Sequence, residues 1–200
     1  MCWNASVSLN TYALGLFASS LSLYNGDSNI RGFIFYQSII LIQLIEYFIW
    51  SKTFSNRLLS QIALFIILCQ PILNIIKIER QPELVPYLLA GYLLFIIIVY
   101  TIVIPFNTID FSSVQSKNGH LAWNWFDWNI YMIIIWHAFL SSRWIIDNMY
   151  FTFIIITIFL IVSVILFKET KTWGSMWCWI SNVASFHLIL RVFYNDFCTI

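Results

Sequence analysis

The chain has 200 residues, of which 60% are hydrophobic and only 10% are charged, and its formal net charge is +1. Soluble domains carry about 25% charged residues, so this composition excludes an ordinary water-soluble globule and predicts that lipid surrounds most of the chain. The small net charge and the lack of a Lys/Arg cluster in the sequence argue against nucleic acid as a partner.

Apolar runs long enough to cross a bilayer, about 20 residues each, recur from one end of the chain to the other. The runs are rich in Ile, Leu and Phe and lack the alternation of a membrane β-strand, which favours helices. We therefore predict an all-α, polytopic (multi-pass) membrane protein, with one domain over residues 1–200 that forms a bundle of seven transmembrane helices. The predicted helices cover residues 5–24, 32–51, 58–76, 86–104, 126–142, 149–167 and 173–193.

Seven crossings would give the bundle two ends that collect different loops. Face A is the end with the N-terminus and the loops after the second, fourth and sixth predicted helices, including a long connection at 105–125 with room to cap a pocket. Face B is the end with the other loops and the C-terminus. Lys and Arg are divided evenly between the faces, so the positive-inside rule gives no orientation.

Tryptophan and the small residues are distributed less evenly. Small side chains allow two helices to approach closely, and they line one side of the first and last predicted helices, which we therefore expect to be neighbours. The excess of tryptophan at face A predicts packing around something at that end, beyond an ordinary aromatic belt. The tryptophans concerned are Trp3, Trp50, Trp123, Trp125, Trp128, Trp173, Trp177 and Trp179.

Glu46 is the acidic residue inside a clear predicted span, in the segment QLIEYFIW. A carboxyl group is costly within lipid, so such a residue is a functional-site hypothesis. Two interpretations stay open: a site that gains and loses a proton, or a protonated carboxyl that only bonds a neighbouring helix. With polar residues of other spans, the first interpretation predicts a pocket near face A lined by Glu46, Gln43, Gln70, Asn182 and Asn10.

Pro71 lies between Gln70 and Asn74 in the third predicted span. Proline has no N–H, so it frees a backbone carbonyl one turn earlier in the helix. This segment predicts either the wall of a cavity or a structural kink whose polar groups are satisfied by neighbouring helices.

Cysteine stands beside tryptophan in MCW at the N-terminus and in MWCW in the last predicted helix. Because odd-numbered helices would run in the same direction, Cys2 and Cys178 are expected near face A, and so is His120 of the long connection. The thiols could form a disulfide, share a metal with His120, or only pack; thiolate and imidazole ligands suit zinc or copper. His137 and His187 occur singly, which gives little support for a zinc hydrolase.

The segments MCWNASVSLN, QLIEYFIW, CQP and SMWCWISNVAS together resemble an uncharacterised family of small seven-helix membrane proteins from bacteria, fungi and large viruses. Its members begin Met-Cys-Phe/Trp-Ser-Ala and carry a Gln-x-x-Glu segment ending in Trp and a Ser-x-Trp-Cys motif in the last helix. The resemblance covers essentially the whole chain and implies an architecture but no activity. Asn4 stands where the family has Ser.

Three functions are compatible with these features. We favour binding or transport of a small molecule or ion at the predicted pocket, with protonation of Glu46 as its switch, because the polar residues extend from the first helix to the last. The second is a membrane-embedded metal- or thiol-dependent redox enzyme using Cys2, Cys178 and His120. The third is a structural or viral envelope membrane protein. Neither a cofactor nor an oligomeric state follows from the sequence.

Overall fold

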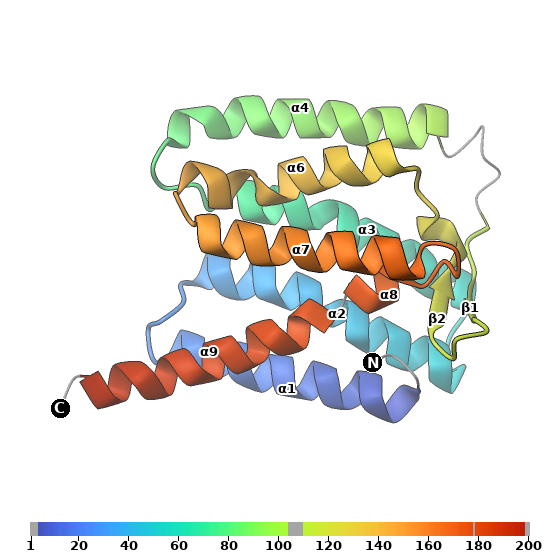
Figure 1. The fold of residues 1–200 in the computed structure, drawn as a ribbon, viewed down its shortest axis with the longest axis horizontal. Coiled ribbons are helices and arrows are strands. Elements are labelled where there is room, and N and C mark those ends of the chain that lie inside the picture. Colours follow the sequence, from blue (N-terminus) through green and yellow to red (C-terminus); the bar gives the residue numbers. More distant parts are fainter. Residues whose placement is uncertain (1–3, 104–109, 178, 199–200) are drawn as a thin grey trace.

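The computed structural model describes residues 4–103, 110–177 and 179–198 and shows a helical protein (Figure 1). The long helices are α1 (Ala5–Tyr24), α2 (Ile30–Ser51), α3 (Asn56–Ile75), α4 (Val85–Ile98), α6 (Ile130–Ile146), α7 (Tyr150–Phe167) and α9 (Trp179–Cys198), and α8 (Trp173–Trp177) is short. The shorter elements are the 3-10 turns η1 (Pro82–Leu84) and η3 (Asn124–Phe126), the π-helical turn η2 (Val99–Val103), and the strands β1 (Ser113–Gln115) and β2 (Leu121–Trp123).

The predicted all-α class is confirmed, and most helices begin and end within a few residues of the predicted bounds. The range 126–142 was wrong, because α6 begins at Ile130, where the Asn129 side chain accepts a hydrogen bond from the Met132 N–H. The expected loop at 105–125 also differs, since β1 and β2 pair antiparallel within it.

Asparagine or serine is the N-cap residue of several of the long helices. Asn4, Asn29 and Ser55 cap α1, α2 and α3 in the same way that Asn129 caps α6. Ser and Asn are both strong N-caps. The Asn4 side chain therefore begins α1 by accepting a hydrogen bond from the Val7 N–H.

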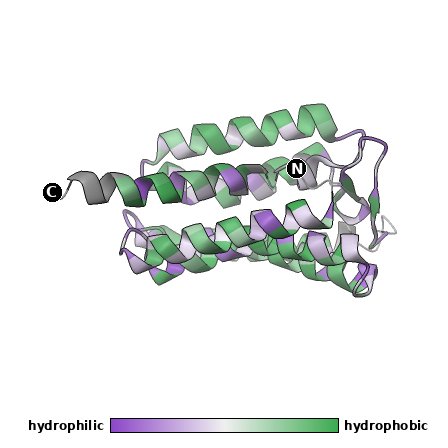
Figure 2. Cartoon of the chain, turned by 90° about the horizontal axis from the view of Figure 1, so that it is seen from below, coloured by the Kyte–Doolittle hydropathy of each residue, from purple (hydrophilic) through white to green (hydrophobic). Residues whose placement is uncertain are grey.

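Within the described part of the chain, five segments are long and apolar enough to cross a bilayer, which suggests a membrane protein: Ile30–Ser51, Asn56–Ile75, Pro82–Thr101, Tyr150–Phe167 and Trp173–Phe193. Two of the long helices are not among them, since α1 is interrupted by Ser, Thr and Asn and α6 is apolar but only 17 residues long. Figure 2 shows hydrophobic residues along the helices and many hydrophilic ones in the connections at both ends of the bundle.

The helices lie side by side, with α1, α2 and α9 on one side and α3, α4, α6 and α7 on the other (Figure 1). α1 packs on both α2 and α9, so the expectation that the first and last long helices are neighbours is confirmed. Gly15 shows why small residues are needed there: a Cβ atom at this position would lie 2.6 Å from Ile40 Cγ2 of α2. The close approach of α1 and α2 therefore depends on glycine.

Pro71 lies inside α3, and its surroundings support the structural interpretation of this segment. The Ile67 carbonyl, one turn before Pro71, accepts a hydrogen bond of 3.3 Å from Trp136 Nε1 of α6. Asn74 Nδ2 donates to the Leu140 carbonyl of α6 at 2.7 Å. Side chains therefore use the polar groups around Pro71 to join α3 to α6.

Candidate functional site

Face A, the end with the β1–β2 hairpin, is built around buried aromatic rings. Trp123 stacks on Trp125 with 5.0 Å between ring centroids, and Phe126 stacks on Trp173 at 4.5 Å. A Cβ atom at Gly174 would lie 2.6 Å from Trp123 and 2.7 Å from Phe126, so glycine lets α8 approach the rings. These three tryptophans pack on one another and on Phe126. Of the other tryptophans in the prediction, Trp3 lies outside the described residues, and so do the side chains of Trp177 and Trp179.

The hairpin is tied to the start of α3. Asn56 Oδ1 accepts a hydrogen bond of 2.9 Å from the Ser113 N–H, while Asn56 Nδ2 donates to the Ser113 carbonyl at 2.7 Å. The Ser113 hydroxyl lies 3.0 Å from the Ser60 hydroxyl and accepts a bond of 2.9 Å from Trp125 Nε1. The Asn56 side chain thus bonds to the backbone N–H and carbonyl of Ser113 as a neighbouring strand would, and it holds the hairpin against the bundle.

The other side of the hairpin is tied to the turn between α7 and α8. The Trp123 N–H donates to the Lys171 carbonyl at 3.1 Å, and Asn118 Nδ2 donates to the Thr172 hydroxyl at 2.9 Å. An ion pair of 2.9 Å joins Lys171 to Asp127 just beyond the hairpin. The long connection therefore covers this end as an anchored hairpin.

Glu46 and Gln43 are the two predicted pocket residues that the structure places deepest. Each has only 1% of its surface exposed, and they lie one turn apart on the inward side of α2. Tyr36 is buried on the same stripe, and Trp50 is half-buried, as the spacing of these residues predicts. Glu46 is five residues before the end of α2 at Ser51, which puts it roughly 7 Å below face A at 1.5 Å per residue.

The other predicted pocket residues occupy different surroundings. Gln70 is buried, donates a hydrogen bond of 3.2 Å to the Ser38 carbonyl, and lines a mainly apolar cavity of about 170 Å³. Asn182 of α9 is half-buried, and Asn10 of α1 is exposed. The structure thus brings Gln43 and Glu46 together at one place on α2, and it does not show Asn10 turned inward with them.

His120 is a buried residue of the hairpin, and burial lowers the pKa of its imidazole. Its ring meets the Phe167 ring edge-on, with 6.3 Å between centroids. Among the residues that the structure describes, no three His, Cys, Asp or Glu side chains gather in a way that could hold a metal ion. Cys2 and Cys178 lie outside the described residues, so the predicted thiol pair stays a prediction.

The remaining histidines have separate positions. His137 Nε2 lies 2.9 Å from the Thr157 hydroxyl, which joins α6 to α7, and His187 is exposed on α9. The His137–Thr157 pair lies in an apolar groove of about 420 Å³ between α6 and α7. This pair is the kind of contact by which polar side chains hold membrane helices together.

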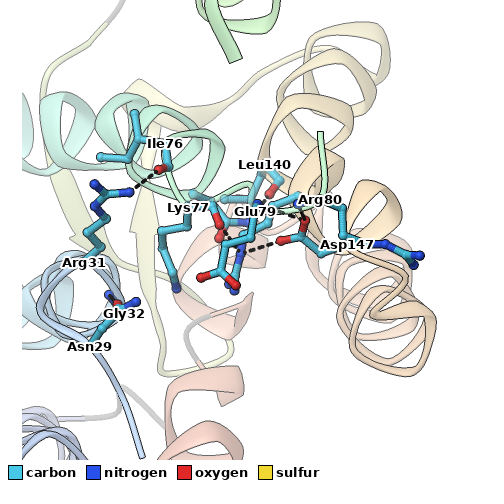
Figure 3. Close-up of polar contacts among 11 residues, drawn as sticks. Asn29, Arg31, Gly32, Ile76, Lys77, Glu79, Arg80, Leu140 and Asp147 are labelled. Atoms are coloured by element: carbon cyan, nitrogen blue, oxygen red, sulfur yellow. Dashed lines mark hydrogen bonds and ion pairs between the residues drawn. The ribbon is translucent and has the colours of Figure 1, made fainter. Parts of the chain in front are cut away.

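Face B, the end with the α1–α2 and α3–α4 turns, holds a charged cluster that the sequence did not single out. Asp147 Oδ1 accepts hydrogen bonds of 3.1 Å from the N–H groups of Glu79 and Arg80, and Arg143 Nε lies 3.2 Å from Asp147 Oδ2 (Figure 3). Arg143 Nε also donates to the Lys77 carbonyl at 3.1 Å. Asp147 therefore holds the turn after α3 against the end of α6.

Lys77 belongs to the same turn, but its ammonium group points away from Asp147 and toward the start of α2 (Figure 3). Its Nζ atom lies 4.8 Å from the centre of the Phe35 ring. Burial, and secondarily the positive charge of Arg143, lower the pKa of Lys77 from 10.5 to about 8. A signal was present in the sequence, since Lys77 follows an apolar span directly, but the surroundings of its side chain come from α1 and α2.

Comparisons with known proteins add no family to these observations. No family model, no curated protein and no solved structure matches the chain.

Proposed function

We propose that this chain crosses the membrane seven times and binds or transports a small molecule or ion, with a proton on Glu46 as its switch. α1 and α6 lie alongside the five apolar segments named above and end at the same two faces (Figure 1), which supports counting them as spans. A helix of 17 residues is at the short end of the range that can cross a bilayer.

The outer surface of the bundle supports the membrane setting. On α7 the side chains of Ile154, Ile158, Ile161 and Ile165 are each at least half exposed, and they recur every three or four residues along one face. A stripe of isoleucine of this length on a water-soluble protein would be an aggregation hazard. In a bilayer, the same isoleucine side chains would contact the acyl chains of the lipids, which are also apolar.

The burial of Glu46 is the observation that carries the functional part of the proposal. Glu46 as a whole residue is 1% exposed, and so is Gln43, one turn earlier on α2. An ionised carboxylate is far more costly to bury than a neutral acid, so a change in the protonation of Glu46 would alter what its surroundings can bind. Carboxylate and amide oxygens together suit a cation or a polar solute in exchange for the proton.

The test uses the full chain in sealed vesicles that contain a pH-sensitive dye. Gradients of Na⁺, K⁺ and ammonium are imposed in turn, and movement of protons in the opposite direction is recorded. We expect at least one gradient to drive proton movement in the wild type and Glu46→Gln to abolish it. Glu79→Gln is the control, because Glu79 is an exposed carboxyl at face B. Equal fluxes in Glu46→Gln and the wild type, or no flux in any gradient, would refute the proposal.

A structural membrane protein is the second candidate, and the aromatic cluster at face A favours it. Four aromatic rings pack against one another there, those of Trp123, Trp125, Phe126 and Trp173. Such packing makes one end of a bundle rigid. If this function is correct, Glu46→Gln would lower stability without changing any flux. The vesicle experiment therefore separates the two candidates.

A further inference from the structure

We propose that a small cavity beside Lys77, at face B, is a binding site for a phosphate-type anion. The site is independent of Glu46, which lies toward the opposite end of α2. It is formed where the end of α1, the start of α2 and the turn after α3 meet.

The cavity is small and its wall is mixed, with Phe33, Phe35 and Leu188 as its apolar part. Its volume is about 140 Å³, well below the roughly 300–1,000 Å³ of pockets for drug-sized molecules. This size suits a single anionic group and is too small for a nucleotide. The polar or positively charged part of the lining comes from Ser19, Ser22, Ser28, Gly32, Tyr36 and Lys77.

Lys77 supplies a positive charge that forms no ion pair among the described residues, although the carboxylates of Glu79 and Asp147 act on it from farther away. The nearby carboxylate of Asp147 is already bonded to other groups. Its two oxygens accept hydrogen bonds from the N–H groups of Glu79 and Arg80 and from Arg143 Nε. Within the described residues no carboxylate lies within ion-pair distance of the Lys77 ammonium. Its partner there is the face of the Phe35 ring at 4.8 Å, and a ring face is a weaker partner than an anion.

Ser22 is an independent sign that a ligand belongs in this cavity. It is 0% exposed, and its hydroxyl has no hydrogen-bond partner among the described residues. The other hydroxyls in the wall are used: Ser19 accepts from Gln37 Nε2 at 2.8 Å, Ser28 donates to a backbone carbonyl, and Tyr36 donates to the Ser181 carbonyl at 2.9 Å. A buried hydroxyl without a partner is costly, and an anion oxygen would accept its hydrogen bond.

The start of α2 adds to the positive potential. The N-terminus of a helix carries the positive end of the helix dipole and favours anions, and α2 begins at Ile30 beside the cavity wall. The Gly32 N–H already donates to the Asn29 side chain. The start of α2 therefore contributes mainly the electric field of the helix dipole, because this N–H group is not available to a ligand. Arg31 does not line the cavity: it is exposed, and its Nη1 donates to the Ile76 carbonyl at 3.5 Å.

The chemistry of an ammonium, a hydroxyl and a helix N-terminus fits a phosphate group. Two sources could supply it: the headgroup of a phospholipid at face B, or free phosphate in the aqueous phase. The membrane setting places the cavity at headgroup depth, where the turns between helices lie.

The experiment uses the full chain purified in detergent and phosphate-free buffer. Calorimetric titration with sodium phosphate measures binding of the free anion, and native mass spectrometry measures how many phospholipids the protein retains. Lys77→Met removes the charge and Ser22→Ala removes only the hydroxyl. Their controls are Arg80→Met, an exposed cation at the same face, and Ser20→Ala, an exposed serine of the same helix.

We expect one saturable site whose affinity falls by about tenfold or more in Lys77→Met and about fivefold in Ser22→Ala, with both controls unchanged. Retention of one phospholipid by the wild type and its loss in the two variants would assign the site to a headgroup. Binding of phosphate without a retained lipid would assign it to the free anion. The proposal fails if the wild type binds neither, or if Lys77→Met and Ser22→Ala both bind as the controls do.

Discussion

The two ends of the bundle are closed by different chemistry. At face A, aromatic rings stack on one another under an anchored hairpin, and the approach of α8 depends on a glycine. At face B, Asp147 ties a turn to α6, and Lys77 lines a small cavity with both polar and apolar walls. The difference indicates that face A is closed by packed aromatic rings, whereas face B is closed by polar and charged contacts.

The largest effect in this comparison is expected from Phe126→Ala. Phe126 is 1% exposed and contacts the rings of Trp128 and Trp173 at 4.6 and 4.5 Å. Removing a buried phenyl ring costs about 3–5 kcal/mol, and denaturant unfolding followed by tryptophan fluorescence would measure it. The matched control is Phe151→Ala, whose side chain is 78% exposed on α7. Equal losses in the two variants would contradict the description of face A as a packed cover.

Gly174→Ala should have the next largest effect. The added methyl group would meet Trp123 and Phe126 at 2.6 and 2.7 Å, so α8 must move away from the cluster. Overpacking of this kind costs about 1–3 kcal/mol, measured by the same unfolding experiment. Gly91→Ala is the control, because its added methyl group would meet Phe139 at an ordinary 3.4 Å. If Gly174→Ala is as stable as Gly91→Ala, the close approach of α8 is not needed.

Asn56→Ala tests how the hairpin is held. It removes both hydrogen bonds to the Ser113 backbone and leaves buried polar groups without partners. We expect a loss of about 1–2 kcal/mol and faster hydrogen exchange at amides of β1 and β2. Asn25→Ala, at an exposed position of face B, serves as the control. Unchanged exchange in the hairpin would show that other contacts hold it.

The last prediction concerns Lys77 at face B. The change of the free energy of unfolding with pH tests the surroundings of its side chain. Burial lowers the pKa of Lys77 from 10.5 to about 8 in the folded protein, while Arg143, Glu79 and Asp147 act on it from nearby. Between these two values the unfolded chain binds more protons than the folded one, so stability rises as the pH increases from about 8 to 10.5. We expect this gain in stability in the wild type and not in Lys77→Met. The same slope in both proteins would assign it to other groups.

The positions of most helices could be predicted from the sequence because backbone groups in lipid must be satisfied within their own segment. The predicted range 5–24 coincides with α1, and 149–167 differs from α7 by one residue at its start. The start of α6 was predicted too early because Phe126 is as hydrophobic as the residues of a membrane helix. In the structure Phe126 belongs to η3 and is a core residue of the aromatic cluster. Hydrophobicity alone does not distinguish contact with lipid from contact with other rings.

One feature of the sequence predicts the hairpin directly. Asn118 and Gly119 form an Asn-Gly pair between short apolar stretches, which is a strong hairpin signal, and Gly119 has the positive φ of 81° that such turns use. The burial of Glu46 and Gln43 did follow from their helical spacing. The cavity at Lys77 could not be predicted, because its walls come from segments that are brought together only when α1, α2 and α3 pack.

The most direct test of the account is whether face A and face B lie on opposite sides of a membrane. All four cysteines are replaced by serine, and single cysteines are placed at Thr53 or Lys117 of face A and at Asn25 or Arg80 of face B. Sealed vesicles are then treated with a thiol reagent that does not cross the bilayer. The account predicts that both positions of one face react before the vesicles are opened and both positions of the other react only afterwards. Reaction of Lys117 and Arg80 from the same side would contradict it.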